Sequence, residues 1–229
     1  MTTVPSADSA EGDFLRRLTD AEAKSLEVRS RRKSFARGAI IFRDGDPGGE
    51  ALVLRSGRVK VSARRHSREV ILAVLDPGSL LGEVSAIDGG PRSATVVALE
   101  PVEVDATSAA DFHAFLEEHP RVAGELLQLV VARLRDASLR QVEFGTVDTL
   151  GRLCGSLTQL AERYGRPLGD HVEVDAPINQ QELAEWAGMS REAVVKGLRQ
   201  LRSLGWLTVD ARVLVLLDPQ AIRRRAGQR

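Results

Sequence analysis

The chain has 229 residues, of which 43% are hydrophobic, and this is enough for one or two domains with cores of their own. Its 32 Lys and Arg balance its 32 Asp and Glu, so the net charge indicates no particular partner, although a balanced chain can still carry a basic face. The single cysteine, Cys154, excludes an internal disulfide and a four-cysteine metal site. No stretch has the roughly 18 apolar residues of a membrane span and no signal peptide is visible, so we expect a cytoplasmic protein.

The N-terminal half changes from helical to strand-like patterns. Residues 1–11 are small and polar, and we expect them to form a disordered tail. From Phe14 to about Ser30, spaced apolar residues and the cap signal Thr19-Asp20 predict two short helices. Between Phe35 and Val104, short runs of Val, Ile and Leu are separated by turns that contain Gly or Pro. This pattern predicts an antiparallel barrel or double-sheet roll.

Helical patterns return after the strands. Ser108 to about His119 predicts a short helix, and Pro120 suits the first turn of another. In that second helix an apolar stripe repeats at heptad spacing through Leu127, Val130, Leu134, Ala137, Gln141 and Phe144. A helix packed on its own domain would also carry a stripe. Because charged residues fill most of the remaining surface, we favour a coiled coil between two copies of the chain.

The C-terminal region has the pattern of a winged helix-turn-helix. Asp148–Tyr164 is amphipathic, and the glycines at 165 and 169 end this helix. In INQQELAEWAGMSREAVVKGLRQL two helices join at Gly188-Met189, and Ser190 is placed as the N-cap of the second. Two later strand-like runs, at 206–209 and 213–217, predict a β-hairpin wing.

The second of these two helices has an apolar face and a basic face. Over residues 190–203, four Lys or Arg minus one Glu give a charge of +3 in a chain whose net charge is zero. A solvated surface helix would also be amphipathic, but it would not concentrate positive charge in this way. The arrangement suits attraction to phosphates and entry into the major groove of DNA.

Among the predicted strands lies a glycine-rich segment, GEVSAIDGGPRSATV, which places Glu83 nine residues before Arg92. A carboxylate can accept a hydrogen bond from a ribose hydroxyl, and a guanidinium can bind a cyclic phosphate with two hydrogen bonds. A structural Glu–Arg pair that closes a loop is the alternative. On these residues alone both interpretations stay open.

Three motifs, FARGAIIFRDGDPG, GEVSAIDGGPRSATV and INQQELAEWAGMSREAVVKGLRQL, follow one another as in the CRP/FNR family of bacterial transcription regulators, which the chain resembles from about Phe14 to Arg225. The resemblance implies an α+β fold, with an N-terminal antiparallel β-roll that binds a cyclic nucleotide, a long dimerisation helix and a C-terminal winged helix-turn-helix. The expected parts are a tail at 1–11, the β-roll at 12–119, the dimerisation helix at 120–145 and the DNA-binding domain at 146–229.

The resemblance also implies a function and a set of ligand-binding residues. The chain would be a homodimeric, sequence-specific transcription regulator whose effector is a cyclic nucleotide, first of all cyclic AMP, and RNA polymerase would be a partner. The ligand-binding residues carried over from the family are Gly82, Glu83, Val84, Arg92, Ser93, Val61, Leu72, Ala73, Arg133, Ala137 and Ser138. Ala137 departs from the family pattern because it lacks a hydroxyl, which weakens or alters recognition of adenine across the dimer. A regulator that binds DNA without ligand, or that senses another small molecule, is therefore an alternative.

For DNA the resemblance implies contacts from Gln180, Ser190, Arg191, Glu192, Lys196, Arg199 and Arg202. Arg191 and Glu192 match the family's base-reading pair, which implies a palindromic site with a half-site resembling GTGA. A nucleotide-binding module whose helix-turn-helix contacts protein is a further alternative. No catalytic motif and no histidines at metal-ligand spacing are visible, so we expect neither an enzyme nor a bound metal.

Overall fold

The computed structural model describes residues 14–65, 68–146, 148–174, 179–210 and 213–227, and the predicted tail lies outside these ranges. Contacts divide the chain into two compact units. The first holds the chain up to Asp136 except for Arg65–Ile71, and the second holds Ala137–Arg229 together with that short segment. The division falls within one long helix, and the domain limits expected from the sequence stay a prediction.

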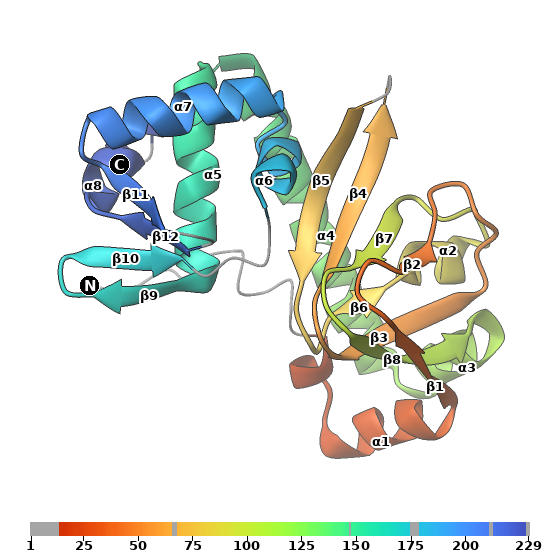
Figure 1. Ribbon diagram of the computed structural model, residues 1–229. Coiled ribbons are helices and arrows are strands. Elements are labelled where there is room, and N and C mark those ends of the chain that lie inside the picture. The colour runs from red at the N-terminus through yellow and green to blue at the C-terminus, as the bar shows by residue number, and fades with distance from the viewer. Residues whose placement is uncertain (1–13, 66–67, 147, 175–178, 211–212, 228–229) are drawn as a thin grey trace. The chain divides into compact units, whose positions relative to one another are not determined.

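The first unit is built on two antiparallel sheets (Figure 1), which confirms the predicted double-sheet roll. One sheet has the strand order β1-β8-β3-β6 and the other has the order β2-β7-β4-β5. The strands are β1 (Ser30–Phe35), β2 (Ile40–Phe42), β3 (Glu50–Ser56), β4 (Val59–Arg65), β5 (Arg68–Leu75), β6 (Leu80–Leu81), β7 (Thr95–Ala98) and β8 (Val102–Ser108).

Two apolar cores stabilise the first unit. The inner core lies between the sheets and includes Leu54, Val59, Val96 and Val104. The outer core packs helical residues such as Phe112 and Phe115 against β3. The helices are η2 (Leu15–Arg17), α1 (Asp20–Val28), α2 (Glu83–Asp88), α3 (Ala109–Glu118) and α4 (Pro120–Thr146). A capping box between Thr19 and Glu22 begins α1, as the cap signal predicts.

Strand β1 differs from the sequence-based interpretation, which began the strands only at Phe35. Its sequence SRRKSF carries no apolar alternation, and it forms because it pairs with β8 along its length. Arg32 of β1 and Arg55 of β3 both donate to Asp105, which is 3% exposed. Burial alone would raise the pKa of Asp105, but these two hydrogen bonds outweigh it and hold the pKa below its ordinary value.

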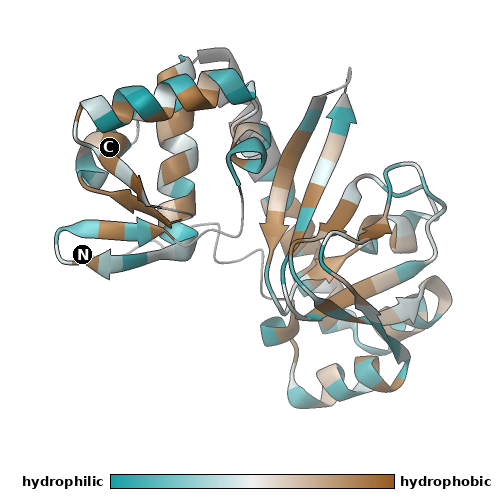
Figure 2. Ribbon diagram, in the orientation of Figure 1, coloured by the Kyte–Doolittle hydropathy of each residue, from teal (hydrophilic) through white to brown (hydrophobic). Residues whose placement is uncertain are grey.

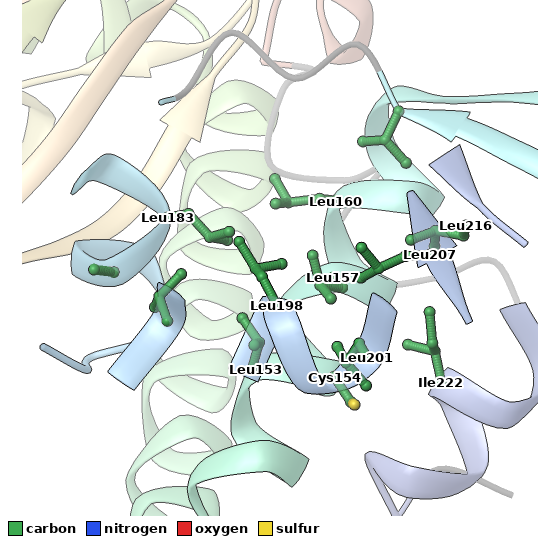
Figure 3. Packing of buried hydrophobic residues seen from close by; sticks show 13 residues of the cluster. Leu153, Cys154, Leu157, Leu160, Leu183, Leu198, Leu201, Leu207, Leu216 and Ile222 are labelled. Atoms are coloured by element: carbon green, nitrogen blue, oxygen red, sulfur yellow. The ribbon is translucent and has the colours of Figure 1, made fainter. Parts of the chain in front are cut away.

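The second unit contains the helix-turn-helix and the wing that the sequence predicts. Its elements are α5 (Thr149–Tyr164), β9 (Gly165–Leu168), β10 (His171–Val174), α6 (Gln180–Trp186), α7 (Arg191–Ser203), β11 (Leu207–Asp210), β12 (Val213–Leu216) and α8 (Pro219–Arg225). Figure 3 shows its core, in which side chains of the helices α5, α6, α7 and α8 meet those of the wing strands. Burial in this core raises the pKa of the Cys154 thiol to about 11.

Two features of the second unit were missed in the sequence. The segment from Gly165 to Gly169 was interpreted only as the end of a helix, but it contains β9, which pairs with β10, and β10 in turn pairs with the wing strand β12. The second missed feature is helix α8, although its sequence carries local helix signals. The Asp218 side chain caps the helix, and Pro219 occupies its first turn. None of the described helices is long and apolar enough to cross a bilayer.

Candidate functional site

A pocket with about 420 Å³ of empty space, part of which is open to solvent, lies in the first unit beside the short helix α2. Of the ligand-binding residues expected from the sequence, it brings together Val61, Gly82, Glu83, Val84, Arg92, Ser93 and Arg133. The other lining residues are mostly apolar, namely Phe42, Leu75, Leu80, Leu81, Ser85, Ala94 and Val96. The pocket is therefore an apolar cavity with a few charged and hydroxyl groups at one side, as is common in small-molecule sites.

Arg92 is a buried cation in this pocket, with 6% of its surface exposed. Its Nη1 donates to the backbone oxygens of Glu50 at 2.8 Å and Gly82 at 3.0 Å, and to Ser85 Oγ at 2.9 Å. Its Nε is buried and has no hydrogen-bond partner among the residues that the structure describes. Burial lowers the pKa of Arg92, while the carboxylates of Glu50, Glu83 and Asp46 act in the opposite direction. A buried N–H group without a partner is costly, so this edge of the guanidinium is suited to an anionic ligand.

Glu83 has a different partner from the one that its spacing suggested. It is 4% exposed and forms an ion pair with Arg133 of α4, which also donates through Nη2 to the Leu80 carbonyl oxygen at 3.1 Å. Every hydrogen bond described for Arg92 goes to other groups. A direct Glu83–Arg92 pair that closes the loop is therefore not formed, and both charged groups line the pocket separately.

The backbone around Arg92 depends on glycine. Gly82 has φ +68°, and a Cβ placed on it would lie 2.1 Å from Arg92 Nη1 and 3.1 Å from the Glu50 carbonyl oxygen. The loop of the FRDGDPG motif holds the other side, since the Gly45 amide donates to the Arg92 carbonyl oxygen at 2.9 Å and the Arg92 amide donates to the Asp46 carbonyl oxygen at 2.8 Å. Two motifs that are distant in the sequence thus fix one arginine.

Four of the expected ligand-binding residues are not brought to the pocket among the described residues. Leu72 is 38% exposed, and Ala73 packs against the inner core without lining the cavity. Adjacent residues of a strand point to opposite faces, so Leu72 and Ala73 cannot both face one ligand. The side chains of Ala137 and Ser138 lie outside the described residues.

Sequence reasoning missed several residues of the pocket wall. Ser85 belongs to the quoted glycine-rich motif, and its place two residues after Glu83 was a usable signal. Phe42 lies in the FRDGDPG motif, but no pattern in the chain predicts that its strand lies beside Arg92. Leu75, Leu80 and Leu81 are typical core residues, and only the fold shows that they also face a cavity.

A second candidate site is the outer face of α7. Arg191, Glu192, Lys196, Arg199 and Arg202 are all exposed, whereas the opposite face of the helix is buried. Figure 2 shows hydrophilic and hydrophobic residues alternating along α7. The expected residue Gln180 is also exposed, at the first position of α6.

A local cap holds the N-terminal end of α7, and close packing on α5 holds its middle. The Ser190 Oγ accepts a hydrogen bond from the Ala193 amide at 3.2 Å. The amide of Glu192 itself and the Ser190 hydroxyl lower the pKa of the Glu192 carboxyl, so it is ionised at neutral pH. A Cβ on Gly197 would lie 2.5 Å from Leu153 Cδ2, which shows how closely α7 crosses α5. The basic face therefore lies on a helix that is capped at its start and packed closely on α5.

Comparisons with known proteins identify the domain that holds each candidate site. Two family models match the chain, Cyclic nucleotide-binding domain over residues 32–119 and Crp-like helix-turn-helix domain over residues 151–225. The CRP-like cAMP-activated global transcriptional regulator of Mycobacterium tuberculosis is 30% identical over 84% of the chain and 86% of that protein. The chain belongs to the CRP/FNR family of transcription regulators.

Other relatives also place this CRP/FNR regulator in the same family. The Cyclic AMP receptor protein of Thermus thermophilus is 35% identical over 82% of the chain and 86% of that protein. The structure of a CooA mutant from Carboxydothermus hydrogenoformans covers 93% of the chain and 95% of its own, with a TM-score of 0.80 and 21% identity, and so shows the shared fold. The family consists of DNA-binding transcription regulators and not of enzymes, which confirms the interpretation of the sequence.

A pair of glycine substitutions tests the close packing at Arg92. Gly82 and Gly89 both have φ +68°, but a Cβ on Gly89 would have nothing within 4 Å. Both Ala variants therefore carry the same backbone strain, and only Gly82→Ala collides with Arg92. We expect Gly82→Ala to lower the free energy of unfolding by about 1–3 kcal/mol more than Gly89→Ala, as overpacking does. Urea unfolding measures the difference, and equal losses would contradict the described contact.

Proposed function

We propose that this regulator is a homodimer whose effector is a cyclic nucleotide, most readily cyclic AMP, bound in the pocket beside α2. The observation that carries the proposal is Arg92, a buried cation with an N–H group that has no hydrogen-bond partner within the described part of the chain. Arg92 binds the cyclic phosphate, Glu83 accepts from the ribose 2′-hydroxyl, and Ser93 adds a hydroxyl donor. Gly82 allows the backbone to approach the phosphate closely.

The choice of cyclic AMP rests on the relatives and not on contacts to the base. Two of the relatives carry cyclic AMP in their names. The described wall offers mostly apolar side chains to a base, so it does not distinguish adenine from guanine by hydrogen bonds. Ala137, which lacks the hydroxyl of the family pattern, supports the alternative of a regulator that binds DNA without ligand or senses another small molecule.

Helix α4 supports dimerisation because it has two apolar faces. Val122, Leu126 and Leu129 are buried against the first unit, and Val130 is partly buried there. Leu127 and Leu134 are each 65% exposed, and they lie seven residues apart on the predicted heptad stripe. A second copy of the chain that packs along this stripe would remove both leucines from water.

The ligand would act by shifting the dimer between conformations with different affinity for DNA. In a two-fold dimer the two α7 helices enter successive major grooves about 34 Å apart, so the target is an inverted repeat. Arg191 binds the O6 and N7 acceptors of guanine and Glu192 accepts from a cytosine amino group, which gives a half-site resembling GTGA. We further propose that the DNA-bound dimer contacts RNA polymerase, and hence that it acts in the cytoplasm.

The ligand assignment is tested by Arg92→Ala. Loss of a charge-assisted pair of hydrogen bonds should weaken cyclic AMP binding by about 10- to 150-fold, which corresponds to 1.5–3 kcal/mol. Titration calorimetry with cyclic AMP and cyclic GMP measures the affinity. Arg31→Ala, at an exposed position of β1, is the control and should bind like the wild type. Unchanged affinity in Arg92→Ala would refute the site, and no binding to the wild type would favour the alternative effector.

The dimer is tested by Leu134→Glu. This variant places two like charges in a narrow apolar seam, which should raise the dissociation constant of the dimer about a hundredfold. Sedimentation at micromolar concentration should then show a species near the chain mass of 24.9 kDa instead of twice that mass. The control is Gln128→Glu, which adds the same charge at an exposed position of α4 outside the stripe. A wild-type protein that sediments as a monomer would disprove the dimer.

DNA recognition is tested by comparing two arginines of α7. Arg191→Ala should weaken binding to the cognate site by about 1–3 kcal/mol and relax selection at one base pair, because a bidentate base contact is lost. Arg199→Ala should weaken binding to all sequences alike and reduce the salt dependence by about one counterion, as expected for a phosphate contact. Selection from random DNA and salt titrations measure both effects. Selection that returns no inverted repeat would disprove the docking geometry.

A further inference from the structure

Phe42 is a pocket residue to which neither the motifs nor the family models assign a role. It ends strand β2, where it pairs with Val96 of β7, and its side chain lines the pocket. Arg92 Cζ lies 4.3 Å from the centre of the Phe42 ring. This is within the distance at which an aromatic ring attracts a cation through its negative face.

The Phe42 ring restrains the rotation of the Arg92 guanidinium, which its described hydrogen bonds do not do. The three described hydrogen bonds of the guanidinium all leave from Nη1, so they fix one corner of the group but leave rotation about that corner open. The attraction between the Phe42 ring and the guanidinium carbon that lies over it opposes that rotation. The Nε edge, for which the described residues supply no partner, is then held in one direction.

Strand β2 and the loop after it hold Arg92 as a single unit. Phe42 contacts the side chain, and three and four residues later Gly45 and Asp46 exchange hydrogen bonds with the Arg92 backbone. The guanidinium is a delocalised, weakly hydrated cation, which makes stacking on a ring favourable inside a pocket. An aliphatic side chain of similar size would fill the space but would lack the quadrupole of the ring.

We propose that Phe42 is the positioning residue of Arg92, and that its aromatic ring directs the free edge of the guanidinium toward the phosphate of the ligand. The role in ligand binding rests on the proposed cyclic-nucleotide function. The orientation of Arg92 in the free protein does not depend on that function, so the two can be tested separately.

The free protein is tested by ¹⁵N NMR of the Arg92 Nε–H group, whose signal is identified by its loss in Arg92→Lys. In the wild type and in Phe42→Tyr we expect a narrow signal that exchanges slowly with water. In Phe42→Leu and Phe42→Met, which fill the space without a ring, we expect exchange about tenfold faster. An unchanged signal in whichever of these two variants folds would overturn the proposal.

The consequence for the ligand is measured by titration calorimetry with cyclic AMP. Phe42→Leu and Phe42→Met should bind about five- to thirtyfold more weakly, whereas Phe42→Tyr should stay within about threefold of the wild type. Ile41→Ala removes an apolar side chain of the same strand that packs on the inner core and does not line the pocket, so it controls for loss of packing and should leave the Arg92 signal unchanged. Wild-type affinity in Phe42→Leu or Phe42→Met, or no rescue by Phe42→Tyr, would overturn the proposal. If the wild type binds no cyclic nucleotide, the proposed function fails, and the NMR signal still decides the role of Phe42.

Discussion

The organisation of the β-roll depends on the cost of burying the Arg92 guanidinium. A cation that is 6% exposed needs acceptors close by, and the chain brings two backbone oxygens and one hydroxyl to a single nitrogen. This close approach requires a glycine at 82 and a loop that turns back to pair with the Arg92 backbone. Glycine-rich motifs that are distant in the sequence therefore surround the Arg92 guanidinium together. They supply acceptors to its Nη1, while its Nε has no hydrogen-bond partner among the described residues.

The second charged group of the pocket connects it to the long helix. Glu83 is held by Arg133, so a ligand hydroxyl that binds the same carboxylate shares it with a residue of α4. Leu134 follows Arg133 in the sequence and belongs to the exposed stripe of this helix. Under the proposed function, this shared carboxylate would link occupancy of the pocket to the position of α4, as coupling between a ligand and a dimer interface requires.

The second unit meets a different constraint, which is to present a basic surface on a rigid element. Helix α7 buries its apolar face in a core shared with α5, the wing and α8 (Figure 3), and Gly197 permits the close crossing with α5. Its charged face stays exposed because no other described element covers it. The helix therefore packs with one face and keeps the other free, and the free face is the one proposed to contact DNA.

The sequence by itself determined the elements whose signals are local. The cap at Ser190 and the apolar period predict α7, the alternation of short apolar runs predicts the roll, and the residue types at 83 and 92 indicate a charged pocket. Long-range pairing decided the rest. Strand β1 exists because β8 and Asp105 hold it, and β9–β10 exists because the pair adds to the wing sheet. Only the tertiary structure shows that Glu83 pairs with Arg133, that Leu72 is partly exposed on the roll and that Phe42 stacks on Arg92, because these contacts join residues far apart in the chain and no local pattern encodes them.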